Sequence, residues 1–462
     1  MKTKSNFLVQ ELKGDTLTPI SILKKISGRK KFLLESSHKY NDSGRYSFIG
    51  ADPALELIAT GNHAQLIKRN GEETILQGNP LEILKRLLPK MEMNDTPFPF
   101  IGGAVGYVGY DIVRQYEDIG PSLENSLNMP DVHLMFYEEL IVFDHLQEKV
   151  TVCGLPILED SDPVQIEKRI MERVEELKQP DYFLEEEPCL FNGYESETTK
   201  ETFINNVKKA KEHILAGDIF QVVLSRRMKS AFQGTPLSVY RKHRANNPTP
   251  YMFYIDFEPY TVIGSSPESL IKVREKQVIA NPIAGTKRRG TSPEDDQFIE
   301  KELLADEKEL AEHKMLVDLG RNDLGRVCEF GTVTVDKYMA VEKFRHVIHL
   351  VSEISGQLTS QNKALDALAA CLPAGTVSGA PKIRAMEIIN SLEESKRGLY
   401  SGAIGYLSAN GNMDFALAIR TMILKDGNAY IQAGAGIVHD SNPESEYEET
   451  VNKLKSFLEG EK

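Results

Sequence analysis

Residues 372–389 join a turn of small residues to the start of a helix, and this combination leaves the stretch few other conformations. Pro381 suits a first helical position, and apolar and basic residues follow it at helical spacing. A helix N-terminus with Lys382 beside it would attract an anion, and Thr376 would add a hydroxyl donor. A tight loop that caps an ordinary helix explains the same pattern, so the stretch alone leaves both interpretations open. A nucleotide P-loop is excluded because its glycine and lysine spacing is absent.

The overall composition is that of a globular chain with an acidic balance. Its 462 residues are 41% hydrophobic and 27% charged, which is enough apolar content for a sizeable core, and the net charge is −13. This charge argues against nucleic acid or an anionic membrane as the main partner. The four cysteines are scattered without a C-x-x-C pair, and neither an apolar signal core nor a membrane-spanning run occurs. We therefore expect a cytoplasmic protein with reduced thiols.

The first part of the chain predicts strands and short helices. Strands are expected at residues 31–36 and 44–50. The glycine-rich run at 102–110 invites a dinucleotide-binding interpretation. It lacks the G-x-G-x-x-G spacing and no clear helix follows, so close backbone packing in a sheet is favoured. Between residues 179 and 199, prolines and an acidic run indicate a domain boundary.

Beyond this boundary, a helix ending near Gly217 and a strand at 219–225 are predicted. Gln221 on that strand would either line a cleft or form a hydrogen bond at a sheet edge. Two further strands are expected within 263–290. The second runs into a basic, glycine-bearing exit that ends at Gly290, which is either an anion site or a solvated loop.

A long amphipathic helix is expected at residues 297–319. Glu309, Glu312 and His313 lie on it at positions i, i+3 and i+4, a spacing that can bind metal. Solvated charge on a helix surface gives the same spacing, so the pattern alone does not define a metal site.

A strand at residues 332–335 is followed by a second predicted helix. This helix would hold His346, His349 and Glu353. Such histidines are usually structural, but these lie near two candidate anion sites.

The chain closes with two predicted strands, 430–432 and 436–438. The glycine-rich segment between them would let backbone approach a ligand closely. A last helix buries an apolar stripe, and Glu449 falls opposite it, facing either water or a cleft.

Taken together, five segments resemble the chorismate-utilising enzymes, and they occur in the family's order within residues 200–455. The segments are 219–227, 282–286, 312–319, 373–386 and 432–436. The N-terminal half is similar to that of anthranilate synthase component I. The resemblance implies an α/β (α+β) fold in which large mixed or antiparallel sheets pack as a sandwich and are covered by helices. It also implies a regulatory domain at 1–190 and a chorismate-binding catalytic domain at 191–462.

The resemblance implies roles for individual residues. Glu312 and Glu449 would hold Mg²⁺, which bridges to the ring carboxylate of chorismate. Three residues are assigned to catalysis: Glu268 as the acid that protonates the departing C4 hydroxyl, His349 in removal of the C2 proton, and Thr376. Backbone N–H groups and side chains, with Arg420 as a bidentate fork, would grip the substrate. The substrate-binding residues are Gly285, Thr286, Lys382, Tyr400, Arg420, Gly434, Ala435 and Gly436.

Two positions separate the branches of this family. Aminodeoxychorismate synthases resemble this chain but carry a nucleophilic lysine where it has Ala284, and isochorismate and salicylate synthases carry a water-activating lysine where it has Gln221. Without either lysine, the attacking group must arrive as ammonia at C2. The chain shows no cysteine motif of a glutamine amidotransferase. The ammonia should therefore come from a separate glutaminase subunit (component II) in a hetero-oligomer, expected to be a heterotetramer, or from free ammonia at high pH.

The N-terminal half adds a regulatory expectation. Two segments resemble the halves of the family's feedback site for L-tryptophan, an inhibitor, and Thr249 stands where the second usually has serine. The expected site residues are Glu35, Ser36, Pro250, Tyr251 and Met252. The resemblance thus implies the catalytic large subunit of anthranilate synthase, a lyase that forms anthranilate and pyruvate in the first step of tryptophan biosynthesis. The alternatives are aminodeoxychorismate synthase component I, disfavoured by Ala284, and a non-catalytic regulator that binds chorismate or tryptophan.

Overall fold

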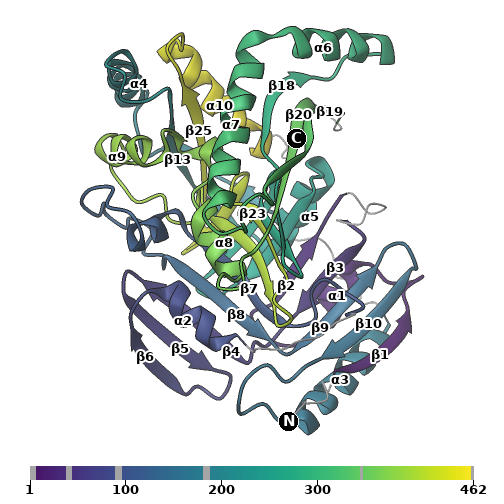
Figure 1. Cartoon of the computed structure of the whole chain (residues 1–462). Helices are drawn as coiled ribbons and strands as arrows, with labels where there is room; N and C mark the ends of the chain where they lie inside the picture. Colours follow the sequence, from purple (N-terminus) through teal and green to yellow (C-terminus); the bar gives the residue numbers. More distant parts are fainter. Residues whose placement is uncertain (1–6, 38–43, 89–95, 181–187, 344–346, 459–462) are drawn as a thin grey trace.

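The computed structural model describes residues 7–37, 44–88, 96–180, 188–343 and 347–458. Two large sheets form the centre of the molecule, and helices lie around them (Figure 1). Every pairing between the named strands of this described part is antiparallel. The predicted α/β class with large antiparallel sheets is confirmed.

The first sheet joins strands from distant parts of the chain, because β2 (Phe32–Glu35) pairs with β14 (Tyr251–Asp256) near its middle. The predicted strands at 31–36 and 44–50 are confirmed as β2 and β3. Across the sheet the order is β1 (Leu8–Lys13), β10 (Lys149–Gly154), β9 (Glu139–Asp144), β3 (Tyr46–Gly50), β2, β14, β15 (Tyr260–Ser266), β24 (Thr421–Lys425), β25 (Asn428–Ile437), β13 (Gln221–Gln233) and β11 (Leu190–Phe191), with β12 (Glu195–Ser196) and β21 (Gly379–Ala380) also paired to β13.

The second sheet mixes the two parts of the chain in the same way. Its β7 (Gly103–Val108) is the glycine-rich run, and it lies between β8 and β22, as close packing in a sheet predicts. The predicted boundary at residue 190 stays a prediction. Across the sheet the order is β18 (Ile283–Arg288), β20 (Val347–Gln357), β17 (Gln277–Ala280), β16 (Ser269–Arg274), β23 (Met413–Leu417), β22 (Ala403–Ser408), β7, β8 (Val132–Tyr137), β4 (Leu55–Thr60), β5 (His63–Lys68) and β6 (Glu73–Gln77), with β19 (Thr334–Lys343) paired to β20.

An aromatic core joins the two sheets. Phe32 of the first sheet contacts Tyr137 of the second, with ring centroids 4.6 Å apart. Phe48 of the first sheet lies 5.7 Å from Tyr406 of the second. These rings belong to one cluster of buried residues drawn from both sheets. Because aromatic rings bury large apolar surfaces, this cluster between the two sheets stabilises their packing as a sandwich.

The helices begin where the sequence supplies a capping side chain. Thr18, Asn79, Asp162, Thr199 and Thr235 each accept a hydrogen bond from a backbone N–H of the first turn that follows. The helices are α1 (Pro19–Lys25), α2 (Pro80–Leu87), η1 (Tyr110–Gln115), α3 (Pro163–Lys178), α4 (Lys200–Leu215), α5 (Pro236–Asn246), α6 (Pro293–Ala305), α7 (Glu307–Gly325), α8 (Ala364–Cys371), η2 (Gly375–Val377), α9 (Lys382–Leu392) and α10 (Pro443–Leu458), where η marks a 3-10 helix.

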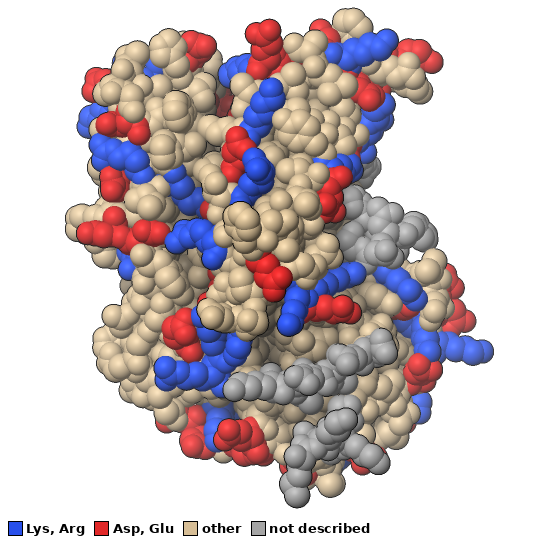
Figure 2. Space-filling view, viewed as in Figure 1, with Lys and Arg blue, Asp and Glu red and all other residues tan. Residues whose placement is uncertain are grey.

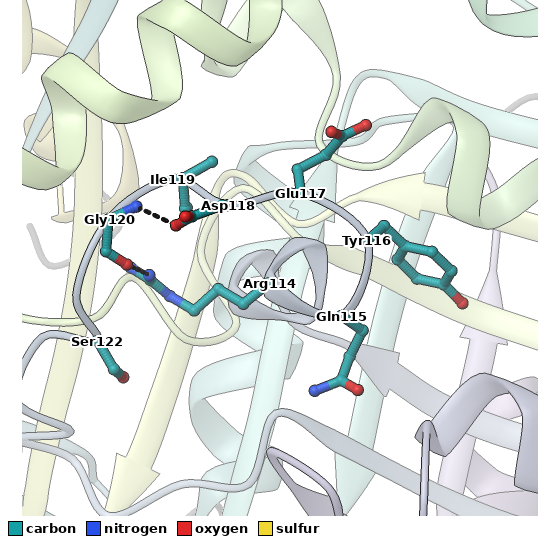
Figure 3. Close-up of a pocket in the computed structure, with 8 residues that line it drawn as sticks. All are labelled: Arg114, Gln115, Tyr116, Glu117, Asp118, Ile119, Gly120 and Ser122. Atoms are coloured by element: carbon teal, nitrogen blue, oxygen red, sulfur yellow. Dashed lines mark hydrogen bonds between the residues drawn. The ribbon is translucent and has the colours of Figure 1, made fainter.

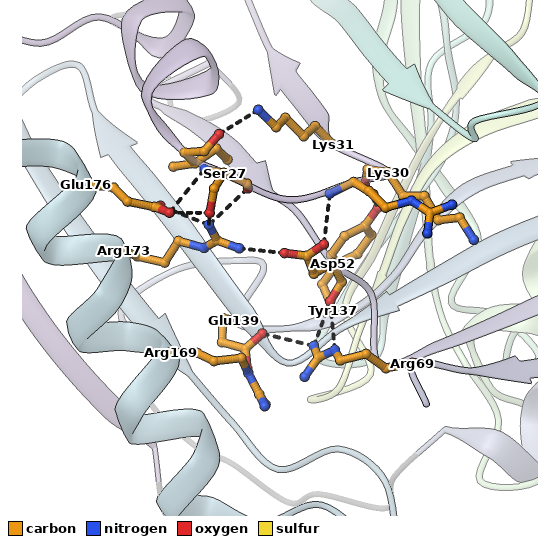
Figure 4. Close-up of polar contacts among 12 residues, drawn as sticks. Ser27, Lys30, Lys31, Asp52, Arg69, Tyr137, Glu139, Arg169, Arg173 and Glu176 are labelled. Carbon is orange, nitrogen blue, oxygen red and sulfur yellow. Dashed lines mark hydrogen bonds and ion pairs between the residues drawn. The ribbon is translucent and has the colours of Figure 1, made fainter. Parts of the chain in front are cut away.

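A polar network fixes α3 against the first sheet (Figure 4). Arg173 of α3 binds Asp52 at 3.0 Å and Glu176 at 2.9 Å. Arg69 reaches Glu139 of β9 at 3.2 Å, and Arg169 of α3 contacts the same carboxylate. Because the pairs are half-buried and share partners, they orient α3 as a connected network.

The prediction of one continuous helix at 297–319 is wrong. The structure breaks it at Asp306 into α6 and α7, which meet at an angle in Figure 1. Asp306 ends α6 in an extended conformation, and its side chain accepts from the N–H of Glu309 at 3.3 Å, which starts α7. Aspartate competes for backbone donors in this way, so it caps a new helix instead of continuing the old one.

The predicted helix around His349 is also wrong, because this segment is strand β20. Val347 and His349 are half-buried, whereas Ile348 and Leu350 are buried, so exposure alternates here as it does on a strand. The β-branched residues of the segment favour a strand when a partner is present, and β18 and β19 supply partners. His346 lies outside the described residues.

Two predictions about the chain's glycine-bearing segments are corrected. The expected strands at 430–432 and 436–438 form one strand, β25, which pairs with β13 over its whole length. The expected basic exit before Gly290 is largely strand β18. Its Lys287 lies 3.5 Å from Asp306, and Arg289 pairs with Asp296, so these cations face carboxylates of the following helices. Figure 2 shows the same interspersion of positive and negative side chains over one whole face.

Candidate functional site

Glu268 and Thr376 form the acid–hydroxyl pair of the candidate site. Glu268 follows β15, where the Oγ of Ser266 accepts its N–H. Thr376 in η2 donates its hydroxyl to Glu268 Oε1 at 2.9 Å. Burial raises the pKa of the Glu268 carboxyl to about 7, and the Thr376 hydrogen bond opposes this rise. The carboxyl can therefore hold a proton near neutral pH, as a general acid must.

His349 lies on β20 opposite Thr286 of β18. Burial lowers the pKa of the imidazole, the backbone of Gly285 raises it through a hydrogen bond, and the nearby charge of Arg420 lowers it again. The ring is therefore neutral at physiological pH and offers a nitrogen that can accept a proton. Strand pairing thus brings three of the predicted residues together, although the Thr286 side chain lies outside what the structure describes.

Arg420 and Tyr400 lie near the glycine segment of β25. Burial lowers the pKa of Arg420, and the nearby Tyr400 hydroxyl raises it. The guanidinium is therefore shielded from water and lies near that phenol. A Cβ atom at Gly434 would lie only 2.9 Å from Tyr400 Oη and 2.9 Å from Leu224 O. Gly434 is therefore required for this close approach of strand and side chain.

The two predicted metal ligands come from different helices, and each is linked to this glycine segment through one other side chain. Glu312 of α7 accepts a hydrogen bond from Gln221 Nε2 at 3.1 Å. Glu449 of α10 pairs with Lys453 at 2.7 Å, and Lys453 donates to the carbonyl of Gly434 at 2.9 Å. Gln221 also lies beside β25, because a Cβ at Gly436 would be 2.7 Å from its Nε2.

The chemistry of these carboxylates fits a magnesium ion. Each has an acidic neighbour one helical turn away, and burial together with that neighbour raises the pKa of Glu309 beside Glu312. For Glu446 beside Glu449, burial and the neighbouring carboxylate raise the pKa against a hydrogen bond from Ser441. Within the described residues, no three His, Cys, Asp or Glu side chains converge on one point. Two carboxylates with water and substrate oxygens are the kind of set that Mg²⁺ accepts.

Three other residues of the predicted patterns lie away from the two carboxylates Glu312 and Glu449. His313 is fully buried and contacts Ser352 Oγ at 2.7 Å, so it packs into the interior. Lys382 pairs with Asp323 of α7 at 2.6 Å, and burial raises the pKa of that carboxyl. Arg384 pairs with Asp218 at 3.0 Å. The cations of the 372–389 stretch therefore have carboxylate partners, and a role of Lys382 toward substrate stays a prediction.

The five residues predicted for the feedback site line one cavity. Glu35 and Ser36 come from the end of β2, and Pro250, Tyr251 and Met252 from the start of β14. Glu35 is buried and accepts hydrogen bonds from Tyr240 Oη at 2.5 Å and Arg244 Nη2 at 2.8 Å. The structure therefore places both segments in one wall.

The opposite wall of this cavity consists of residues that no sequence motif indicates. It includes Arg274, Tyr406 and Asp414, which belong to the second sheet. Asp414 accepts from Tyr251 Oη at 3.1 Å and pairs with Lys272 at 2.9 Å. No local pattern signals these residues, since they reach the cavity only through packing of the two sheets.

A separate surface hollow of about 480 Å³ follows η1 (Figure 3). It is lined by the end of η1 and by the loop that follows, and Arg114 of η1 donates to the carbonyl of Gly120 at 2.7 Å. Glu117, which lines the hollow, pairs with Arg326, the residue that follows α7, at 3.6 Å. The hollow contains none of the predicted site residues. Across the described residues, no helix is long and apolar enough to cross a membrane.

Comparison with known proteins identifies the class. The model of the chorismate binding enzyme family matches residues 30–459. A solved isochorismate synthase of Escherichia coli, specific for menaquinone, shares the fold, with a TM-score of 0.75 at 19% identity over 99% of this chain and 95% of that one. The chain therefore belongs to the chorismate binding enzyme family.

Within that family, three relatives that match nearly the whole chain are anthranilate synthase components. Anthranilate synthase component 1 of Acetivibrio thermocellus is 46% identical over 98% of this chain and 94% of its own length. The same component of Lactococcus lactis is 44% identical over 97% and 98%. The crystal structure of anthranilate synthase component I from Streptococcus pneumoniae has a TM-score of 0.83 at 42% identity and covers 96% of this chain and 98% of that one.

Proposed function

We propose that the chain is the catalytic large subunit of anthranilate synthase, which converts chorismate and ammonia to anthranilate and pyruvate in the first step of tryptophan biosynthesis. Similarity over nearly the whole length of anthranilate synthase component 1 relatives supports this activity. The observation that carries it within the site is the Glu268–Thr376 pair, a buried carboxyl with a pKa near 7.

The first step requires a proton at the leaving hydroxyl. Glu268 holds that proton near neutral pH, because burial disfavours its carboxylate. As ammonia forms a bond to C2 and the ring double bonds shift, the C4 hydroxyl takes the Glu268 proton and leaves as water. Thr376 can then donate to the new carboxylate and stabilise it.

The second step removes the C2 proton while pyruvate is eliminated. His349 suits this step because its imidazole is neutral in the folded protein. Loss of the proton makes the ring aromatic, which drives the elimination forward. Arg420 would bind a substrate carboxylate, and its desolvated position would strengthen that ion pair.

Mg²⁺ is part of this proposal, with Glu312 and Glu449 as its protein ligands. When bound, the ion would neutralise a substrate carboxylate and fix its orientation. Glu312 contacts Gln221, whose amide lies beside Gly436, and Glu449 is linked to Gly434 through Lys453; these contacts support the assignment.

The proposal also includes a partner subunit, inhibition by L-tryptophan and a division into two domains. A glutaminase subunit would supply ammonia in a heterotetramer, in the cytoplasm. L-Tryptophan would occupy the cavity beside Glu35 and Ser36 and inhibit the enzyme. Residues 1–190 would form the regulatory domain and 191–462 the catalytic domain, with the cavity between the two sheets linking them.

Product identity tests the proposed function. Purified protein with chorismate, Mg²⁺ and ammonium at alkaline pH should produce the fluorescence of anthranilate. Formation of the 4-aminobenzoate precursor instead would support aminodeoxychorismate synthase, which Ala284 disfavours. Unchanged chorismate together with measurable binding of chorismate or tryptophan would support a non-catalytic regulator.

A further inference from the structure

Arg397 is a buried arginine whose guanidinium joins three separate segments of the chain. It lies in the loop between α9 and β22, and its exposed fraction is 2%. Its Nε and Nη2 donate to the two carboxylate oxygens of Glu393 at 2.8 and 2.6 Å. Nη1 donates to the carbonyl of Val377, and Nη2 donates to the carbonyl of Val223, both at 2.7 Å. The remaining N–H lies 3.5 Å from Ser401 Oγ, so the whole fork faces acceptors.

This guanidinium is itself held in one position. Burial lowers the pKa of Arg397, but the charge and hydrogen bonds of Glu393 more than offset this effect, so the side chain stays charged. Its Cζ lies over the Tyr110 ring, 4.9 Å from the centroid. Glu393 in turn accepts the N–H and the hydroxyl of Ser225 on β13, both at 2.9 Å. Arg397 is therefore a fixed donor for the two carbonyls that it reaches.

The Val377 carbonyl belongs to η2, the short turn that carries Thr376. This turn has three residues, and the Val377 N–H reaches the Ala374 carbonyl only at 3.3 Å. A single 3-10 turn with a long hydrogen bond has little rigidity of its own. The shorter, charge-assisted bond from Arg397 therefore fixes the peptide next to the residue whose hydroxyl donates to Glu268.

The Val223 carbonyl belongs to β13, which supports the glycine segment of β25. Val223 pairs with Gly436 of β25, and its own N–H donates to the carbonyl of Ser378, just after η2, at 2.9 Å. Arg397 thus binds η2 and the strand beside the glycine segment with one rigid group.

We propose that Arg397 is a positioning residue of the candidate site, which holds η2 against β13 so that the Thr376 hydroxyl meets the Glu268 carboxyl. This inference rests on the proposed function, in which Glu268 supplies the proton for the leaving hydroxyl. Lysine cannot take this place, because its ammonium lacks the planar fork that reaches two carbonyls and a carboxylate at once.

The titration of Glu268 tests this role. Burial raises the pKa of Glu268, and the Thr376 hydrogen bond lowers it. Arg397→Lys should weaken that hydrogen bond and so raise the titration midpoint by about 0.5 to 1 pH unit. Carbon-13 NMR of protein labelled at the glutamate carboxyl carbons measures the midpoint, and Glu268→Gln identifies the resonance. The rate of anthranilate formation should fall about tenfold, and its alkaline decline should move to higher pH by the same amount.

Two further variants separate positioning from general support of the fold. Thr376→Val removes the hydroxyl directly and should raise the midpoint at least as much. Adding Arg397→Lys to it should raise the midpoint no further, because both changes act on one hydrogen bond. Arg226→Lys is the matched control, since Arg226 is also buried but donates to Thr450 of α10, and its Glu268 midpoint should equal that of the wild type.

A wild-type midpoint in Arg397→Lys would overturn the inference, and so would shifts that add in the double variant. If Arg397→Lys fails to fold, Glu393→Gln decides the question. Glutamine offers the guanidinium one oxygen in place of two, so the Glu268 midpoint should rise, and a wild-type value would contradict us. If the wild type forms no anthranilate, the proposed function fails, whereas the titration of Glu268 still decides the role of Arg397.

Discussion

Glu268→Gln should abolish turnover and yet stabilise the folded protein at alkaline pH. The folded carboxyl has a pKa of about 7, against an ordinary value of 4.5. Between these values the unfolded chain is ionised while the folded chain keeps its proton, so folding binds a proton and stability falls as pH rises. The gap of about 2.5 pH units corresponds to a cost of about 3 kcal/mol at pH 8 and about 1 kcal/mol at pH 5.5. Glutamine keeps the shape of the side chain and removes that cost.

Thermal unfolding of both proteins at pH 5.5 and 8 measures the difference. The variant's advantage in melting temperature should be larger by a few degrees at pH 8 than at pH 5.5. Glu329→Gln is the control, because Glu329 is exposed, and it should show no such pH dependence. In the wild type, the rate of anthranilate formation at saturating ammonia, followed by fluorescence, should fall above about pH 7, because the Glu268 carboxyl then loses its proton. Equal pH dependence of stability in wild type and Glu268→Gln would show that the carboxyl is ionised throughout and would refute the acid role.

Three further predictions concern the metal, the second step and feedback. Glu312→Gln and Glu449→Gln should each lower turnover at least a hundredfold with an unchanged circular dichroism spectrum, and normal Mg²⁺-dependent rates in both would remove them from the metal site. His349→Ala should let an aminated, non-aromatic intermediate accumulate, detected by chromatography, whereas recovery of chorismate alone would place His349 in the first step. Ser36→Phe should fill the cavity between the sheets and raise the tryptophan concentration for half-inhibition more than tenfold with little loss of uninhibited rate. A parallel loss of basal rate and inhibition would move the regulatory site elsewhere.

Candidate residues could be proposed from the sequence because the family's motifs surround them. Glu268 and Thr376 lie in short local patterns, and so do the glycines of β25. Their proximity could not be predicted, since Glu268 and Thr376 are 108 positions apart and meet only when η2 packs beside the end of β15. The pKa of Glu268 depends on that burial and therefore also belongs to the folded state.

For secondary structure, too, the sequence predicts what local contacts determine and fails where distant partners are needed. Capping side chains such as Thr199 act within one turn of the chain, so the start of α4 is determined locally. The segment around His349 was wrongly expected to be helical because a strand's hydrogen-bond partners lie elsewhere in the sequence, here on β18 and β19.

The sequence by itself determined the family, the acidic balance and the chemistry that each candidate side chain can perform. The tertiary structure alone decided which of these side chains act together. It brought Gln221 to Glu312 from 91 positions away, and it closed the cavity beside Ser36 with Asp414 from the other sheet. The reason is physical: side-chain chemistry is a property of one residue, whereas proximity, burial and unpartnered polar atoms arise only when distant strands and helices pack together.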